Sequence, residues 1–97
     1  MTKRILKVLG KSHALEILES LSEKPMRFVD LKEVCKSNRT RTVRLKELKE
    51  EGLIRALPKL SKDRAYTFYE ITLKGKRTLK LVEKIVNLSS DEEKVQS

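Results

Sequence analysis

Hydrophobic residues first recur at helical spacing just after Ser12. Ser12 can cap a helix, because its hydroxyl can accept a hydrogen bond from a backbone N–H of the first turn. The apolar side chains that follow are three and four residues apart, at Ala14, Leu15, Ile17, Leu18 and Leu21. This pattern predicts an amphipathic helix that ends before Pro25. Upstream, the apolar group at residues 5–9 is cut off by Gly10 and predicts a separate turn of helix or an arm.

The next apolar positions predict a short strand and a brief second helix. Residues 26–28 are few enough to form a bridging strand. Leu31, Val34 and Cys35 then place three apolar side chains on one face of a helix. We therefore interpret Cys35 as a small core residue rather than a redox sensor.

A third helix is predicted from about residue 38 to residue 51. Ser37 is its N-cap, and Leu45 and Leu48 face inward. Gly52 follows at the C-terminal position, where a positive φ costs little. A polar turn of about three or four residues joins the second helix to the third, and this arrangement is a helix-turn-helix.

Two later segments are typical of strands. Residues 53–57 and 66–71 are rich in β-branched, aromatic and aliphatic residues. The basic stretch 58–65 separates them as a hairpin loop would. We interpret the pair as a wing that packs on the helices.

The last periodic segment predicts a terminal helix. Thr72 can cap it, and it continues to about Leu88; a helix of about sixteen residues spans roughly 24 Å. Its apolar stripe is broader than a small core needs, so we expect part of it to form a subunit interface. The predicted interface joins this stripe to the apolar N-terminal group, at Ile5, Leu6, Leu9, Leu79, Val82, Ile85 and Val86.

Together these elements predict an α+β fold that is mainly helical: a winged helix-turn-helix with a two-stranded wing and a C-terminal dimerisation helix. The 97 residues are enough for one domain and not for two independent cores. We assign residues 1–88 to this domain and expect the acidic segment 89–97 to be a disordered tail. No apolar run approaches the roughly 18 residues that cross a bilayer, and the N-terminus does not resemble a signal peptide. We therefore expect a cytoplasmic protein with no membrane partner.

Charge is concentrated in particular segments. Lys and Arg number 23 against 14 Asp and Glu, and the resulting net charge of +9 favours an anionic partner. Residues 36–46 hold five basic residues and no acid. Two more basic clusters occupy the hairpin loop, at Lys59, Lys62 and Arg64, and the start of the last helix, at Lys74, Lys76, Arg77 and Lys80. The cluster at the start of the last helix can serve solubility as readily as it can serve binding.

A basic helix followed by a basic hairpin can hold duplex DNA at two points, with the helix in the major groove and the hairpin on the backbone or in the minor groove. In a helical projection with Leu45 and Leu48 inward, the outward residues are Arg39, Val43, Lys46 and Glu47, with Thr42 and Arg44 on the flanks. Val43 can contact a thymine methyl group. The candidate DNA-binding residues are Ser37, Asn38, Arg39, Thr40, Arg41, Thr42, Val43, Arg44 and Lys46 in the helix, and Lys59, Lys62 and Arg64 in the wing.

Arg41 conflicts with this projection, which turns it toward the core, where a charged residue is disfavoured. Either the helix begins later than predicted, or the stem of Arg41 bends inward and its guanidinium reaches a phosphate at the surface. We favour the second interpretation.

Other chemistries find little support in the composition. A single histidine, His13, leaves no Ser-His-Asp or Cys-His arrangement, and the chain has no Gly-rich phosphate loop, so we do not expect an enzyme. One cysteine and one histidine cannot build a structural zinc site, and we expect neither a metal nor a cofactor. Tyr66, Phe68 and Tyr69 are more typical of packing residues than of a base-stacking platform.

Several short motifs add a family resemblance through their order and spacing. They are Gly10-Lys11, Arg27-Phe28 with Leu31, Ser37, Arg44-Leu45 with Leu48, Gly52-Leu53-Ile54, and Tyr69, Ile71, Thr72 and Gly75. Over about residues 10–80 the chain resembles the winged-helix transcriptional regulators of the HxlR type, with a looser likeness to MarR-type and archaeal winged-helix regulators. The resemblance implies a homodimer on palindromic operator DNA, with the third helix in the major groove and the terminal helices pairing the subunits.

The chain departs from that family pattern at two positions. Ser12 stands where an aromatic residue is common after the Gly-Lys pair, and Arg41 stands where an apolar residue is usual. Some relatives sense reactive chemicals through an N-terminal cysteine, and this chain has no cysteine before Ser12. That sensing mechanism is therefore not implied for it.

The sequence predicts a sequence-specific, homodimeric regulator that binds double-stranded DNA. Two alternatives stay open. The first is a winged-helix protein-interaction module, in which the wing and the apolar terminal helix bind another protein. The second is a non-specific architectural or RNA-binding protein, which would show no preference among duplex sequences.

Overall fold

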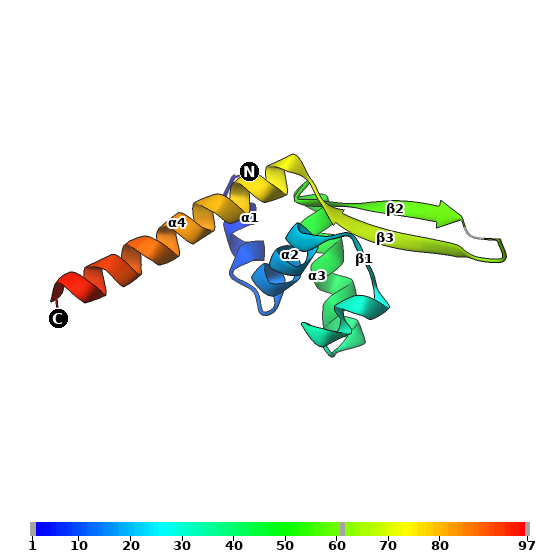
Figure 1. The fold of residues 1–97 in the computed structure, drawn as a ribbon, viewed down its shortest axis with the longest axis horizontal. Helices are drawn as coiled ribbons and strands as arrows, with labels where there is room; N and C mark the ends of the chain where they lie inside the picture. Colours follow the sequence, from blue (N-terminus) through cyan, green and yellow to red (C-terminus); the bar gives the residue numbers. More distant parts are fainter. Residues whose placement is uncertain (1, 61, 97) are drawn as a thin grey trace.

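A cluster of helices carries a long hairpin on one side and a long helix on the other (Figure 1). The computed structural model describes the backbone of residues 2–60 and 62–96 and the side chains of residues 4–60 and 62–88. The elements in chain order are α1 (Thr2–Leu9), α2 (Ala14–Glu23), β1 (Met26–Arg27), the 3-10 helix η1 (Val29–Glu33), α3 (Asn38–Glu50), β2 (Ile54–Leu60), β3 (Ala65–Ile71) and α4 (Leu73–Gln96). The hairpin and α4 extend in opposite directions, and the molecule measures 59 × 29 × 24 Å.

One hydrophobic core joins every α-helix and η1 to the base of the hairpin. Leu31, Leu48 and Leu53 are fully buried in it, and Cys35 is 1% exposed, as expected for a core residue. Burial of each such leucine contributes about 1.5–3 kcal/mol to the free energy of unfolding. Because α3 and the hairpin share this core, their relative positions are fixed.

The sheet has three strands in the order β1-β3-β2, all antiparallel. The wing was predicted with two strands, and Met26 and Arg27 add a third by pairing with Tyr69 and Phe68. Strand β2 runs three residues beyond the predicted end, as far as Leu60, and so includes Pro58. A proline is tolerated there because β2 lies at the edge of the sheet, where a missing backbone donor leaves no ladder partner unsatisfied.

Two predicted caps are confirmed and one is wrong. Ser37 accepts a hydrogen bond from the Thr40 backbone N–H at 3.1 Å, and Thr72 accepts one from the Gly75 N–H at 3.0 Å. Ser12 does not cap α2, since the N-cap is His13. His13 adopts a φ of 67°, and its Nδ1 lies 3.0 Å from the carbonyl oxygen of Val34, so α2 is tied to the end of η1 instead.

The apolar N-terminal group finds its partner within the domain. It forms the helix α1, and Val8 and Leu9 lie in the core at 2% and 9% exposure. Arg4 also pairs with Glu50 and Glu51 at the end of α3, both at 3.1 Å. The prediction that Leu9 is an interface residue is therefore wrong for this structure, because its side chain is already covered by its own domain.

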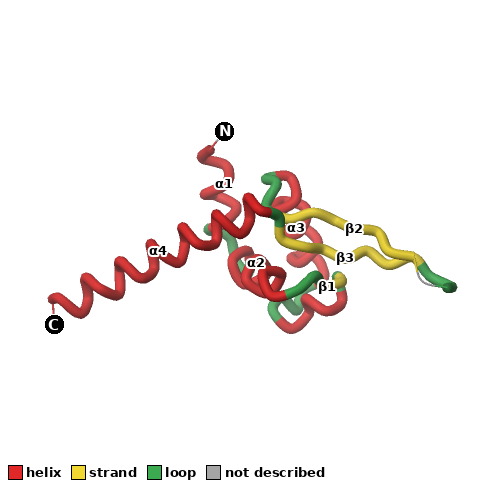
Figure 2. The backbone as a smooth tube through the Cα atoms, turned by 45° about the horizontal axis from the view of Figure 1, so that its top comes forward, coloured by secondary structure: helices red, strands yellow, loops and turns green. Residues whose placement is uncertain are grey.

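Helix α4 is longer than predicted. It begins against the core, where Leu79 is buried and Val82 packs on it, and then projects away from the body (Figure 2). It continues past the predicted end near Leu88 as far as Gln96, so most of the segment that we expected to be a disordered tail is helical. None of the helices in the described part of the chain is long and apolar enough to span a membrane.

Candidate nucleic-acid interface

Helix α3 separates an inward face from an exposed one. Arg41, Leu45 and Leu48 are buried at spacings of four and three residues, which turns the opposite face to solvent. The exposed positions of that face include Arg39, Thr42, Val43 and Lys46. Neither Arg39 nor Lys46 forms an ion pair with a described side chain, so both cations are available to a ligand. The predicted outward positions are confirmed for Arg39, Val43 and Lys46 and are wrong for Glu47, whose side chain is only 14% exposed.

The first turn of α3 presents several small polar groups at the surface. Ser37 and Asn38 are exposed, and Thr40 is half-buried. The Thr42 hydroxyl donates to the Asn38 carbonyl oxygen at 2.8 Å, which holds it against the helix. A helix N-terminus carries unpaired backbone N–H groups and the positive end of the helix dipole, and it is therefore suited to a phosphate.

Arg41 lies inside the protein. Its side chain is 2% exposed, and its guanidinium stacks 4.1 Å from the centre of the Phe28 ring. It donates hydrogen bonds to the carbonyl oxygen of Cys35 and to Oδ1 of Asn38, while Nε finds no partner among the described residues. The projection of Arg41 toward the core is thus confirmed. The expectation that its guanidinium reaches the surface is wrong, because Cys35 in the turn before α3 and Asn38 at the start of α3 supply the acceptors.

Arg44 connects α3 to the turn between α1 and α2 and is not an open cation. Its Nε donates to the carbonyl oxygen of Ser12 at 2.8 Å, and it pairs with Glu47 at 3.0 Å. Lys11 also pairs with Glu47. These two cations hold the pKa of the Glu47 carboxyl below its ordinary value, with Lys11 the larger influence. The side chains of Arg44 and Glu47 are only 15% and 14% exposed, so neither presents much surface to DNA.

The wing carries its cations at the far end from the body. Lys59, Lys62 and Arg64 are all exposed. Lys59 lies on β2 rather than in the loop where we placed it, with Nζ 5.1 Å from the centre of the Phe68 ring. Helix α3 packs against β2, and the hairpin continues outward from that contact (Figure 1). Thr42, Lys46 and Lys49 line a pocket together with Tyr69 of β3, so this part of the exposed face of α3 adjoins the sheet from which the wing extends.

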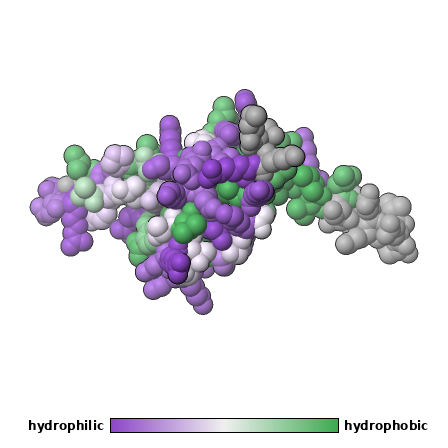
Figure 3. Space-filling model, turned by 180° about the vertical axis from the view of Figure 1, so that it is seen from behind, coloured by the Kyte–Doolittle hydropathy of each residue, from purple (hydrophilic) through white to green (hydrophobic). Residues whose placement is uncertain are grey.

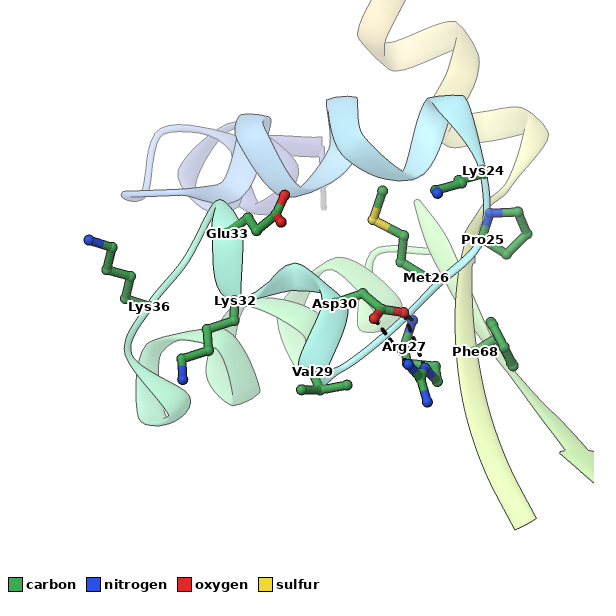
Figure 4. Close-up of a pocket in the computed structure, with 10 residues that line it drawn as sticks. All are labelled: Lys24, Pro25, Met26, Arg27, Val29, Asp30, Lys32, Glu33, Lys36 and Phe68. Carbon is green, nitrogen blue, oxygen red and sulfur yellow. Dashed lines mark hydrogen bonds and ion pairs between the residues drawn. The ribbon is translucent and has the colours of Figure 1, made fainter. Parts of the chain in front are cut away.

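An open groove of about 870 Å³ lies between β1, η1 and the wing (Figure 4). Its ten lining residues are Lys24, Pro25, Met26, Arg27, Val29, Asp30, Lys32, Glu33, Lys36 and Phe68. Arg27 and Asp30 point toward each other and pair at 3.2 Å. This pairing lowers the pKa of Asp30, so the carboxylate stays ionised and Arg27 balances its negative charge. The exposed Lys32 and Lys36 extend the positive surface beyond α3. Sequence reasoning missed Lys32, although its place in the helix-turn-helix could have indicated it.

The predicted interface residues fall into two groups. Leu9 and Leu79 are buried in the core, and Ile5 and Val82 pack on it. The exposed residues are Leu6, Ile85 and Val86, at 69%, 64% and 56%, joined on α4 by Leu81 and Leu88. Figure 3 shows hydrophobic side chains gathered along the projecting part of α4. The described residues include no group of three or more side chains that could hold a metal ion.

A helix-turn-helix with an exposed basic helix, followed by a basic β-hairpin, defines the winged helix-turn-helix class of DNA-binding proteins. Comparison with protein families agrees, because a family model described as HxlR-like helix-turn-helix matches residues 8–96. The chain belongs to this family, and its function is DNA-binding transcription regulation rather than catalysis. A search of curated proteins finds no match.

Solved structures share the fold over nearly the whole chain. The putative transcriptional regulator YtcD has a TM-score of 0.76 and 19% identity, with 97% of each chain covered. A putative MarR-family regulator from Enterococcus faecalis V583 has a TM-score of 0.84 and 16% identity, covering 94% of this chain and 84% of that one. Reduced YodB, a transcriptional regulator from B. subtilis, has a TM-score of 0.77 and 25% identity, with 93% and 88% covered.

Proposed function

We propose that this regulator acts in the cytoplasm as a homodimer that binds a palindromic operator in double-stranded DNA. The observation that supports the proposal is that the exposed face of α3 adjoins the sheet from which the basic wing extends. An α-helix fits the major groove, and a hairpin beside it can reach the adjoining backbone or minor groove.

Helix α3 reads base edges in this proposal. Arg39 and Lys46 can donate to guanine acceptors, and Val43, which is 41% exposed, can contact a thymine methyl group. Arg44 contributes less than the sequence indicated, since its guanidinium is engaged by Ser12 and Glu47.

Phosphate contacts come from the rim of this surface. The first turn of α3 offers Ser37 and Asn38 beside Lys36, and the groove next to it adds Lys32. On the far side the wing offers Lys59, Lys62 and Arg64. Such contacts fix the register of the protein on the duplex and carry no sequence information themselves.

The exposed apolar stripe of α4 supports the homodimer. Leu81, Ile85, Val86 and Leu88 are each 56–64% exposed on a helix that projects away from its own core. A groove between α2 and α4, lined by Leu15, Val82 and Val86, continues this surface onto the body. Pairing of two such helices would bury it and would place two copies of α3 for half-sites about one helical turn apart, or multiples of that.

Selection of bound fragments from random duplexes, together with sedimentation of the free protein, tests the proposal. We expect an enriched sequence with two inverted half-sites, and a dimer at tens of micromolar protein. Enrichment of one unrepeated half-site with a monomeric protein would remove the dimer and leave the regulator. Binding with no sequence preference, or binding of single strands, would instead support an architectural or RNA-binding protein. No retardation of duplex DNA at micromolar protein and low salt would support a protein-interaction module.

A further inference from the structure

We propose that Leu60, at the tip of the wing, enters the minor groove of bound DNA and wedges against a base step, so that the protein bends its operator. This inference rests on the proposed function, because it assigns a role to the wing of a DNA-bound regulator. It adds a specificity-determining residue outside α3 and a preference for deformable DNA.

The exposure of Leu60 is the first observation. At 88% it exceeds that of every other large hydrophobic side chain in the described part of the chain, the next being Leu6 at 69%. A single exposed leucine is common on protein surfaces and by itself indicates nothing. Its position in the hairpin is what distinguishes it.

Strand register places Leu60 on the inner face of the wing. Paired residues of antiparallel strands share a face, and Leu60 pairs with Ala65 as Ile54 pairs with Ile71. Leu60 lies six positions after Ile54, an even number, so the two side chains lie on the same face of β2. Ile54 and Ile71 are buried in the core. The face that packs on the body near the base of the wing therefore continues outward to Leu60.

The distal part of this inner face is uncharged. Beyond the body it consists of Pro58 paired with Thr67 and Leu60 paired with Ala65. The neighbouring cation Lys59 lies on the opposite face of the ribbon, beside Phe68. A wing that bound only phosphates would gain nothing from this apolar face, whereas the minor groove offers deoxyribose walls and base edges to it.

The charges around the tip identify nucleic acid as the occupant. Lys59 immediately precedes Leu60, and Lys62 and Arg64 lie in the connection to β3, all exposed. Figure 3 shows hydrophobic surface near the end of the wing among hydrophilic side chains. The cations before and after Leu60 in the chain can bind the two backbones that border a groove about 6 Å wide, with Lys59 reaching from the opposite face of the ribbon. Apolar wedges in that position partly unstack a base step and bend the duplex toward the major groove.

The wedge predicts which DNA sequences the wing prefers. Pyrimidine–purine steps, above all TA, unstack and kink most readily. We therefore expect such a step in the operator at the positions under the wing, beyond the bases that α3 reads. In the selected DNA fragments, this preference would appear as enriched base pairs at positions that no side chain contacts in the major groove.

The test uses the full chain and a selected duplex that carries 2-aminopurine in turn at each step under the wing. Wild-type binding should raise the 2-aminopurine fluorescence at one step, and energy transfer between the duplex ends should report a bend. In Leu60→Ser we expect loss of both signals and an affinity about tenfold lower. Leu60 makes no core contact, so circular dichroism should show the variant folded.

Leu73→Ser is the matched control, because Leu73 is another exposed leucine, at 63%, and lies at the start of α4 away from the wing tip. It should keep wild-type fluorescence, bending and affinity. The wedge is overturned if wild-type protein binds without either signal, or if Leu60→Ser behaves like wild type; the regulator then stands. If wild-type protein does not bind duplex DNA at all, the proposed function fails and the wedge with it.

Discussion

Arg41 occupies a position on α3 where the next inward side chains are Leu45 and Leu48. The protein accommodates this cation with the Phe28 ring and with two acceptors, the Cys35 carbonyl oxygen in the turn before α3 and Oδ1 of Asn38 at the start of α3. The guanidinium is thereby an internal support for the turn and for the exposed Asn38, and it is too deeply buried to contact a phosphate.

The variant Arg41→Met distinguishes internal support of Asn38 from direct contact with a phosphate. The substitution removes a buried charge but leaves the Cys35 carbonyl oxygen and Oδ1 of Asn38 without their donor, so we expect the free energy of unfolding to fall by about 1–3 kcal/mol. Affinity for the selected operator should fall about tenfold because Asn38 loses its support. The slope of log affinity against log salt should not change. A slope smaller by about one per subunit would show instead that Arg41 contacts a phosphate.

Glu47 is the residue through which pH acts on the contact between α3 and the start of α2. Its folded-state pKa is lowered by Lys11 and Arg44, so its stabilisation is complete above the ordinary carboxyl pKa of about 4.3. That stabilisation is lost as the pH falls through the lower, folded-state value.

We expect the free energy of unfolding of Glu47→Gln to be about 1 kcal/mol lower than that of wild type at pH 7. The value is modest because Lys11 is partly exposed. The difference between the two proteins should shrink at pH 3, where wild-type Glu47 begins to be protonated. Urea denaturation at both pH values measures it. A difference that is the same at pH 3 and pH 7 would contradict a paired carboxylate.

At the scale of elements, periodicity predicted most of this protein. The helices α2, α3 and α4, the hairpin, and the caps Ser37 and Thr72 follow from local spacing and chemistry, and the structure confirms them. The brief second helix is instead the 3-10 helix η1, which ends at Glu33, before Val34 and Cys35. The third strand and the longer β2 were missed because strand pairing depends on partners far along the chain. Arg44 illustrates the same limit in the site: its place on α3 was predictable, but its partner Ser12 is distant in sequence.

The start of α4 depends on Gly75. A Cβ at this position would lie 2.2 Å from the Leu53 carbonyl oxygen and 2.6 Å from Cγ1 of Ile71. Alanine gains about 1 kcal/mol over glycine in helix propensity. The clash with backbone outweighs that gain, because overpacking costs about 1–3 kcal/mol and this neighbour cannot rotate away.

We therefore expect Gly75→Ala to destabilise the protein, in a thermal or urea transition, despite its better helix propensity. Gly10→Ala is a suitable comparison, since a Cβ there would come no closer than 3.4 Å to its nearest neighbour. Equal or greater stability of Gly75→Ala would mean that α4 does not dock as closely as described.

The whole molecule divides its surface between two tasks. On one side, α3 and the wing present cations around a helix that fits the major groove. In the opposite direction, α4 carries an exposed apolar stripe away from the core (Figure 1). The body between them holds these surfaces in fixed relation, so that pairing through α4 would set the spacing between two DNA-binding surfaces.

The central claim is that the cations of α3 and those of the wing contact one duplex together. Operator affinity measured over a range of salt concentrations tests it most directly, with wild type, Arg39→Gln and the double variant Lys62→Gln/Arg64→Gln. We expect a steep salt slope for wild type. The wing variant should reduce that slope by about two per wing, and Arg39→Gln should lower affinity by about 1–3 kcal/mol. A wild-type affinity independent of salt, or a wing variant with an unchanged slope, would contradict the shared surface.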